Sequence, residues 1–284
     1  MNENSPLPLS IKDWLADATR QLVFAEIPSA RLDSELILAH TLRQNRSYLH
    51  AHDEDSLSDR DLEIANARLA LRLDRVPVAY IIGHKEFYGR RFRVTTATLV
   101  PRPESEALIE LLELAVPKNE ALIAEQPLRL VDVGTGSGAL GITAKLTHPE
   151  LDVTLVDNSR FALKVAEQNA KALNAEVAVL HSDLLDGFPF EADIIIANLP
   201  YVDPAWERSP ETNHEPAEAL FAANEGKALI FKLITQTKNK LTVGGHLILE
   251  ADPEQHADII SHAKDYGLLL QETKEYGLLF QKLK

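Results

Sequence analysis

The 284-residue sequence contains no cysteine and only one methionine, so disulfide bonds are excluded as a source of stability. The first ten residues have neither the basic part nor the apolar part of a signal peptide. Apolar runs are short, and none approaches the roughly 18 residues that a membrane-spanning helix needs. We therefore expect a cytoplasmic protein that has no membrane partner. As a separate expectation, we take it to be a monomer.

Positive charge is also scarce. Lys and Arg number 29 against 43 Asp and Glu, which gives a formal net charge of −14. An acidic chain repels polyphosphate, whereas proteins that bind nucleic acid usually present a basic patch, so RNA or DNA is disfavoured as a partner without being excluded. One basic cluster forms either a local positive patch or, as we favour, the solvated charges of a hairpin. Its members are Lys85, Arg90, Arg91, Arg93 and Arg102.

Residues 1–75 predict a small helical bundle. Ser10 and Asp13 resemble a capping box, and apolar residues recur at helical spacing behind them. Pro28-Ser29 and Ser58 begin two further helices. This region has no glycine-rich loop and no cluster of histidines or carboxylates at metal-ligand spacing. We therefore interpret it as a domain that recognises a partner such as the substrate, or as a structural lid.

The remaining sequence predicts a linking β-hairpin and then an α/β domain. Aromatic and apolar residues over 76–99 are separated by turn-forming residues, namely Pro77, Gly83 and Gly89, which favours a hairpin there. Residues 100–284 carry short, continuous apolar runs separated in part by helical segments, a pattern typical of a parallel sheet covered on both faces. The runs are 128–133, 153–156, 177–180, 194–197 and 246–250, and two final strands are expected at 268–270 and 278–280.

A glycine-rich loop follows the first of these runs. Glycine occupies every second position after Asp132, and it permits a tight turn that brings the backbone close to a ligand at the carboxyl edge of the sheet. We expect Asp132 itself to take part in cofactor binding, either by capping the loop amides or by reaching a cationic amino group. The loop consists of Gly134, Thr135, Gly136, Ser137 and Gly138. Together with Gly141 it also satisfies the dinucleotide fingerprint G-x-G-x-x-G, which is weak by itself. The spacing D-x-G-x-G-x-G instead resembles the first motif of S-adenosylmethionine-dependent methyltransferases.

Acidic residues follow the next two runs. Asp157 ends the second run about 20 residues beyond the loop, where a carboxylate can accept hydrogen bonds from both hydroxyls of a ribose. Asp183 and Leu184 follow the third run. In methyltransferases an acidic residue there typically holds the adenine amino group while an apolar neighbour covers the ring. The structural alternatives are a helix cap for Asp157 and an ordinary turn for Asp183, and we interpret His181 as a packed or solvated residue.

The fourth run ends in Asn198-Leu199-Pro200-Tyr201, which resembles the [N/D/S]-P-P-[Y/F/W] motif of methyltransferases that act on planar nitrogens. The lone pair of an amide nitrogen is delocalised, so the nitrogen needs orientation rather than proton removal. The Asn198 side-chain oxygen and the Leu199 carbonyl can each accept one N–H, while Tyr201 packs over the flat group. We therefore predict Asn198, Leu199, Pro200 and Tyr201 as catalytic residues, with Asn198 also contacting the cofactor and with no metal.

Over almost its whole length the chain resembles the release-factor glutamine methyltransferases. The matching segments are 30–36, 77–83, 85–89, 100–106, 132–138, 198–201, 214–216 and 219–220. The resemblance implies a Rossmann-like seven-stranded domain at 100–284 that uses S-adenosylmethionine. It also implies that the methyl acceptor is the side-chain amide of the glutamine in the Gly-Gly-Gln motif of peptide-chain release factors.

Two departures from the family pattern and several alternatives accompany this interpretation. Leu199 stands where the common pattern has proline, and residues 221–226 stand where a Gly-Gly-x-x-Gly stretch is usual.

Alternative functions also remain open. A sister group methylates a ribosomal-protein glutamine, and Asn-Leu-Pro-Tyr also occurs in ribosomal RNA adenine dimethyltransferases. A catalytically silent binding module and, more distantly, an NAD-dependent dehydrogenase are further alternatives. Arg102 and Glu104 are expected either to line the cleft or to form structural salt bridges.

Overall fold

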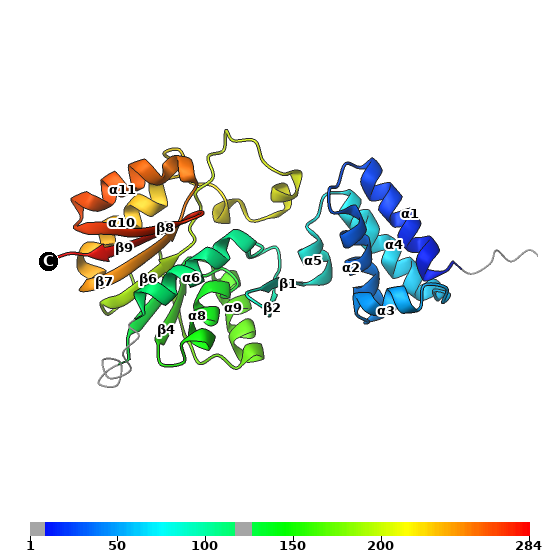
Figure 1. The fold of residues 1–284 in the computed structure, drawn as a ribbon, viewed down its shortest axis with the longest axis horizontal. Coiled ribbons are helices and arrows are strands. Elements are labelled where there is room, and N and C mark those ends of the chain that lie inside the picture. Colours follow the sequence, from blue (N-terminus) through cyan, green and yellow to red (C-terminus); the bar gives the residue numbers. More distant parts are fainter. Residues whose placement is uncertain (1–8, 117–126) are drawn as a thin grey trace, which may run out of the picture. The chain divides into compact units, whose positions relative to one another are not determined.

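The computed structural model describes residues 9–116 and 127–284, which divide into two compact units (Figure 1). One unit comprises the described residues up to Gly83 together with Ser209–His214. The other comprises His84–Arg208 and Glu215–Lys284. The division at Gly83 falls within the stretch 76–99 that the sequence assigns to a hairpin.

The N-terminal unit is built from helices whose starts are set by capping side chains. Ser10 and Ser58 each accept a hydrogen bond from the backbone N–H three residues later, which satisfies an amide that the helix itself leaves free. The helices are α1 (Ile11–Phe24), α2 (Ala30–Leu42), α3 (Arg46–Ala51), α4 (Asp59–Leu73) and α5 (Val78–Ile82). Trp14, Leu22, Ile37 and Leu38 pack in its core.

The hairpin starts later than the sequence indicates. Residues 78–82 form the short helix α5 instead of a strand, because Pro77 fixes the backbone at its start and Gly83, at φ +76°, ends it in the left-handed region. The hairpin itself consists of β1 (His84–Phe87) and β2 (Arg90–Arg93). Positive φ angles at Tyr88 and Gly89 make the tight turn between them.

A buried arginine holds the segment Ser209–His214 within the N-terminal unit. Arg72 is 5% exposed and donates to Asp33 at 2.7 Å and to Glu211 at 3.0 Å. The ring of His214 lies 2.8 Å from the carbonyl oxygen of Asp74. Buried charges are tolerated only when they are paired, so removal of the arginine would leave Asp33 without its main counter-charge.

The second unit is an α/β domain around one seven-stranded sheet. Its strands are β3 (Arg129–Val133), β4 (Asp152–Asp157), β5 (Ala178–His181), β6 (Ala192–Ala197), β7 (Leu241–Glu250), β8 (Leu268–Lys274) and β9 (Gly277–Lys282). Their order is β5-β4-β3-β6-β7-β9-β8. All neighbouring pairs are parallel except those of β9, which runs antiparallel to β7 and β8. The predicted seven-stranded Rossmann-like fold is confirmed.

Helices cover both faces of this sheet because neither face of its inner strands is polar. On one face, Leu130 and Ile196 pack in a core with α6 (Glu106–Ala115), α8 (Ala139–Thr147) and α9 (Arg160–Leu173). On the other, Val131 and Ile195 pack in a core with α10 (Ala228–Lys240) and α11 (His256–Asp265). Neighbouring residues on one strand point to opposite faces, which explains the continuous apolar runs. The 3-10 turns are Pro103–Ser105, Pro210–His214, Ala217–Ala219 and Pro253–Gln255.

Within residues 9–116 and 127–284, no helix has the length and apolar character required to cross a membrane.

Candidate active site

The predicted site residues meet where the strand order reverses. From β3 the chain proceeds outward through β4 and β5 on one side, and then returns to place β6 on the other side of β3. Val133 at the end of β3 pairs with Ala197 at the end of β6. Gly134 and Asn198 therefore leave adjacent strands at the same carboxyl edge, which is where open α/β sheets bind their ligands.

A cavity opens at this edge of the sheet. It is lined by residues 134–137 of the glycine-rich loop, by Asp157, Asp183 and Leu184, and by residues 198–200. Other parts of its wall are Phe87, Ala97, Thr98, Leu99, Pro101, Ser105, Pro216, Glu218, Ala219 and Leu229. Within 97–105 the sequence predicts only Arg102 and Glu104 as possible cleft residues, whereas the structure lines the cavity with their neighbours and with the segment 216–219.

The glycine-rich loop turns through left-handed backbone angles. Gly134, Gly136 and Gly138 have φ values of +72°, +55° and +84°, a region where side chains are disfavoured. A Cβ on Gly141 would lie 2.3 Å from Leu155 and 2.9 Å from Asp132. Close packing of α8 on the sheet therefore requires glycine at that position, much as the third glycine does in the dinucleotide fingerprint.

Asp132 lies beneath the loop and does not line the cavity. Its Oδ2 accepts from the Thr135 hydroxyl at 2.5 Å and from the Gly141 backbone at 2.9 Å. Its Oδ1 is buried without a hydrogen bond to any described residue. Burial raises the pKa of Asp132 to about 6, against the effect of those two hydrogen bonds. In the described structure Asp132 shapes the loop.

Asp157 lies on the cavity wall and is 9% exposed. Its two oxygens accept from the backbone of Gly136 at 2.9 Å and of Ser159 at 2.8 Å. Burial raises the pKa of this carboxyl, and the backbone hydrogen bonds oppose the rise. Each carboxylate oxygen has a second lone pair, so the group retains capacity for the hydroxyls of a ribose.

Asp183 and Leu184 both line the cavity, but they differ in burial. Leu184 is 7% exposed and turns at φ +48°. The side chain of Asp183 is exposed and forms an ion pair with Lys232 at 2.6 Å. His181 is exposed and its ring lies 2.9 Å from the Asn158 carbonyl oxygen, at the surface rather than in the cavity wall.

Asn198 is held at the cavity wall by its amide nitrogen. Nδ2 donates to the Ser105 hydroxyl at 2.9 Å, and Oδ1 has no hydrogen bond to any residue that the structure describes. A free acceptor therefore lies beside the glycine-rich loop. The next residue, Leu199, is 3% exposed, and its Cδ2 would be 2.8 Å from a Cβ on Gly134. Leu199, which replaces the usual proline, thus packs against Gly134, and this close contact leaves no room for a side chain at position 134.

Tyr201 is half-buried and does not line the cavity. Its hydroxyl donates to Glu250 at 3.1 Å, and its carbonyl accepts from Gln255 at 2.8 Å. Burial and the neighbouring Glu250 raise the pKa of this hydroxyl far above its usual range, so it stays protonated. The structure therefore places Asn198, Leu199 and Pro200 together at the cavity and Tyr201 behind them.

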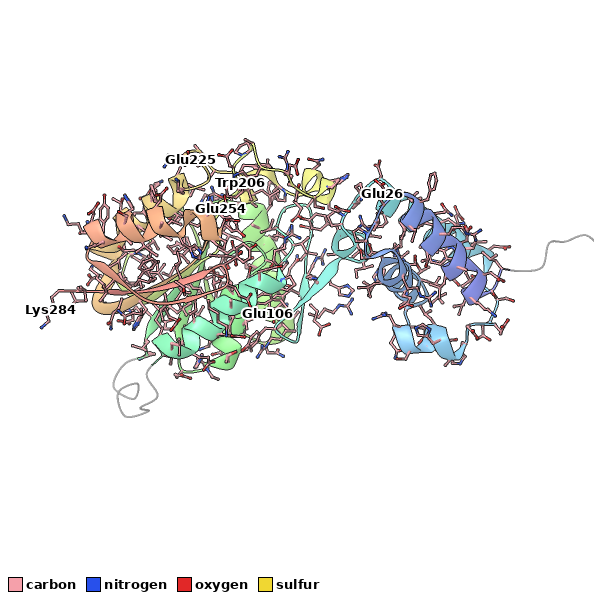
Figure 2. All side chains as sticks on the ribbon, turned by 45° about the horizontal axis from the view of Figure 1, so that its top comes forward. Glu26, Glu106, Trp206, Glu225, Glu254 and Lys284 are labelled. Atoms are coloured by element: carbon pink, nitrogen blue, oxygen red, sulfur yellow. The ribbon has the colours of Figure 1, made fainter. Side chains whose placement is uncertain are left out.

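The segment 221–226, which departs from the family pattern, packs against Tyr201. Gly226 has φ +81°, and a Cβ there would lie 1.9 Å from the Tyr201 carbonyl oxygen. Gln255 bridges the segment by donating to the carbonyls of both Tyr201 and Glu225, which is labelled in Figure 2. One glycine of the family pattern is thus essential for the close approach, while Asn224 and Glu225 adopt positive φ without being glycine.

Arg102 forms a structural salt bridge instead of lining the cavity. Its guanidinium pairs with Glu215, whose carboxylate also accepts from the Val100 backbone at 3.1 Å. Neither Arg102 nor Glu104 is part of the cavity wall. The pair instead ties the stretch before α6 to the segment that carries Pro216.

The charge of the cavity distinguishes between classes of ligand. Three carboxylates line it, Asp157, Asp183 and Glu218, and no Lys, Arg or His among the described residues does. A cation is therefore favoured inside, whereas a pyrophosphate would face carboxylates without a basic partner in the wall. The donor and acceptor set fits the sulfonium and ammonium groups of S-adenosylmethionine better than it fits a dinucleotide.

Comparisons with known proteins agree with this geometry. Residues 110–277 match the family model described as methyltransferase small domain, and residues 13–83 match the PrmC N-terminal domain. A methyltransferase from Pyrococcus furiosus shares the fold, with a TM-score of 0.54 and 17% identity over 77% of this chain and 98% of that one. Fold, site and family model together define a methyltransferase of the Rossmann-like class.

Relatives of known name are similar over most of the chain. The release factor glutamine methyltransferase of Coxiella burnetii is 34% identical over 255 residues, which cover 89% of this chain and 90% of that protein. The enzyme of the same name from Escherichia coli K12 is 34% identical over 251 residues, covering 85% and 86%. The chain belongs to the release factor glutamine methyltransferase family.

Proposed function

We propose that this protein transfers a methyl group from S-adenosylmethionine to the side-chain amide nitrogen of a glutamine in a peptide-chain release factor, in its Gly-Gly-Gln motif. The names of the relatives support the substrate class. The observation that carries the proposal is the free Oδ1 of Asn198, which lies at the cavity beside the glycine-rich loop while its Nδ2 is bound to Ser105. We further propose that the protein acts in the cytoplasm as a monomer.

The cofactor fits the acidic cavity. When bound, S-adenosylmethionine supplies a methyl group on a positively charged sulfur. Asp157 would accept from the ribose hydroxyls, the loop 134–138 would approach the ligand through its backbone, and Asp183 with Leu184 would hold the adenine. Asp132 would act from below by holding the loop. The carboxylates of the wall favour a sulfonium cation by simple electrostatics.

The chain's own contribution to the reaction is orientation. Asn198 Oδ1 accepts one N–H of the substrate amide and the Leu199 carbonyl accepts the other, which fixes the plane of the NH₂ group. A nitrogen–carbon bond forms as the carbon–sulfur bond breaks, and the nitrogen then loses one proton to solvent. Positioning of this kind is worth several powers of ten in rate, and loss of one polar contact to the reacting group typically costs about 10²- to 10³-fold.

The test supplies the protein with labelled S-adenosylmethionine and three acceptors: purified release factor, ribosomal protein and RNA. We expect label in the release factor, and mass spectrometry of its peptides should locate the methyl group on the glutamine side chain. Label in the ribosomal protein alone would reassign the substrate within the same chemistry. Label in RNA alone, or no cofactor binding in a calorimetric titration, would overturn the proposal.

A further inference from the structure

A buried carboxylate joins two segments of the cavity wall that lie far apart in the sequence. The side chain of Glu215 has an exposed fraction of 0%. Its Oε2 accepts from the Val100 backbone at 3.1 Å, and its Oε1 pairs with the Arg102 guanidinium. Pro101, between these two residues, and Pro216, next to Glu215, both line the cavity. The carboxylate therefore holds the two wall segments together.

Stability alone does not account for this buried charge. A buried carboxylate loses its hydration and is tolerated only when an opposite charge and hydrogen bonds compensate. Among the residues that the structure describes, only Arg102 forms an ion pair with Glu215. Apolar side chains of similar volume often stabilise a fold equally well. What the carboxylate adds is a fixed geometry, because its two oxygens bind two donors at defined points of one short stretch.

A continuous series of hydrogen bonds leads from the ion pair to Asn198. The Arg102 carbonyl accepts from the Ser105 backbone N–H at 3.2 Å, which closes the 3-10 turn Pro103–Ser105. The Ser105 hydroxyl in turn accepts from Asn198 Nδ2 at 2.9 Å, and Ser105 is only 4% exposed. The place of Ser105 therefore depends on Arg102, and the place of the Asn198 amide depends on Ser105.

We propose that Glu215 and Arg102 are positioning residues that fix the turn 103–105, so that Ser105 holds the Asn198 amide where its oxygen meets the substrate. Neither residue lines the cavity, so both act through the turn. A displacement of about 1 Å at a reacting group can lower a rate about 100-fold, which gives this precision a catalytic value. The inference rests on the proposed function for its effect on turnover, but its geometric part does not.

Glu215→Gln is the sharpest perturbation, because it keeps the size of the side chain and removes one of two acceptors. Val100 and Arg102 bind different oxygens of Glu215, and an amide offers an oxygen at one end only. Arg102→Lys keeps the charge of the pair, whereas Arg102→Ala removes it. Glu254→Gln, at an exposed position labelled in Figure 2, is the matched control and should behave as wild type.

Amide hydrogen exchange tests the geometric part without any substrate. The Ser105 N–H donates to the Arg102 carbonyl and not to Glu215, so its exchange rate reports whether the ion pair orders the turn. We expect exchange at least about tenfold faster in Glu215→Gln than in wild type. The Ile142 amide of α8 reports overall stability, and its rate should stay within about threefold. Unchanged exchange at Ser105, or equal acceleration of both amides, would overturn the inference.

The second readout is turnover with the release factor at saturating S-adenosylmethionine. Glu215→Gln and Arg102→Ala should lower kcat about 10- to 100-fold, and Arg102→Lys less than about fivefold. The Kd for S-adenosylmethionine should stay within about threefold, because the ion pair acts on the motif and not on the residues proposed to hold the cofactor. Values of kcat within about twofold of wild type for both Glu215→Gln and Arg102→Ala would contradict the proposal.

A double-mutant cycle separates a positioning role from a general loss of structure. If the ion pair acts through Ser105, its loss should matter little once the Ser105 hydroxyl is gone. We expect the kcat of Ser105→Ala combined with Glu215→Gln to lie within about twofold of that of Ser105→Ala alone, whereas independent effects would multiply. Multiplied losses would refute transmission through Ser105.

These outcomes separate the inference from the function on which it partly rests. A wild-type protein that methylates no glutamine, but whose Ser105 amide exchanges faster in Glu215→Gln, would refute the proposed function and leave the geometric role standing. A wild-type protein that methylates glutamine while its Glu215→Gln variant matches it in exchange and kcat would refute the positioning role alone. If Glu215→Gln fails to fold, the contrast between Arg102→Ala and Arg102→Lys decides by the same measurements, because Arg102 is partly exposed and more readily replaced.

Discussion

Two buried aspartates flank the glycine-rich loop and are expected to behave differently. Asp132 supports the loop from below and has a pKa of about 6 because of burial, well above its ordinary value of 3.8. Asp157 faces the cavity and accepts backbone hydrogen bonds with both oxygens. The first residue is therefore best tested through stability and the second through cofactor affinity.

The raised pKa of Asp132 makes a stability prediction with a definite sign. The folded state binds this proton more tightly than the unfolded state, so the group favours folding below pH 3.8. That contribution is lost as pH rises from 3.8 to about 6, and it amounts to about 3 kcal/mol at roughly 1.4 kcal/mol per pKa unit. Asp132→Asn has no carboxyl group to titrate and so does not lose this contribution. Urea titrations should therefore show the free energy of unfolding of the variant rising relative to that of wild type between pH 4 and 7. A difference in the free energy of unfolding between the two proteins that does not change with pH would contradict the raised pKa of Asp132.

Asp157→Ala should weaken cofactor binding more than it affects the fold. Loss of a charge-assisted hydrogen bond costs about 1.5 to 3 kcal/mol, which corresponds to a roughly 10- to 150-fold rise in the Kd for S-adenosylmethionine. Isothermal titration calorimetry measures this directly. Asp152→Ala, at the exposed start of the same strand, is the control and should bind as wild type does. Equal affinity in both variants would remove Asp157 from the cofactor site.

The sequence predicts the cavity residues that follow strand ends and misses those that approach from elsewhere. Asp157, Asp183, Leu184 and Asn198 line the cavity because the carboxyl ends of parallel strands meet at one edge. Ser105 lies 93 positions from Asn198 along the chain, so no local spacing reveals their contact. The direction of Tyr201, which turns to Glu250 and away from the cavity, is likewise decided by tertiary packing.

At the scale of elements, sequence patterns predict the long segments and miss the short ones. Strands of the sheet are buried on both faces, so their apolar runs are continuous and easy to recognise. Helices α3 and α5 have only six and five residues, too few to display a helical period, so the sequence pattern places the residues of α5 within the hairpin. Capping serines before α1 and α4 give correct helix starts because their interaction is local.

The buried arginine of α4 gives a stability prediction for the N-terminal unit. Arg72→Met leaves Asp33 buried without its counter-charge, so about 3 to 5 kcal/mol of stability should be lost. Trp14 lies in the core of this unit and the only other tryptophan is Trp206, so a Trp206→Phe background isolates its fluorescence. Urea unfolding followed by that fluorescence measures the loss. Arg60→Met, on the exposed side of the same helix, should change stability by less than about 0.5 kcal/mol, and an equal effect would contradict the argument.

At the scale of the whole molecule, the acidic charge bears on the choice of partner. The net charge is −14, and the cavity wall is acidic as well. The net charge already counts the basic residues of the hairpin, and Arg102, which lies outside the hairpin, is paired with Glu215. A protein of this kind should bind a protein acceptor in preference to a polyanion.

Titration with structured RNA tests this expectation. At about 150 mM salt we expect no retardation of RNA in a native gel up to about 0.1 μM protein, a concentration below the Kd of about 10⁻⁴ to 10⁻⁶ M that non-specific binders typically have. Methylation of the release factor should proceed at the same rate when RNA is added in excess. RNA binding in the nanomolar range would favour the adenine-methylating alternative.

In the proposed reaction the Asn198 oxygen orients a flat NH₂ group without taking its proton. The most direct test is the single-turnover rate of methyl transfer to release factor by Asn198→Ala at saturating S-adenosylmethionine. We predict a rate at least about 100-fold below that of wild type, because the lost acceptor acts on the reacting group and not on cofactor binding. A rate within a few-fold of wild type under these conditions would contradict the orienting role and with it the proposed reaction.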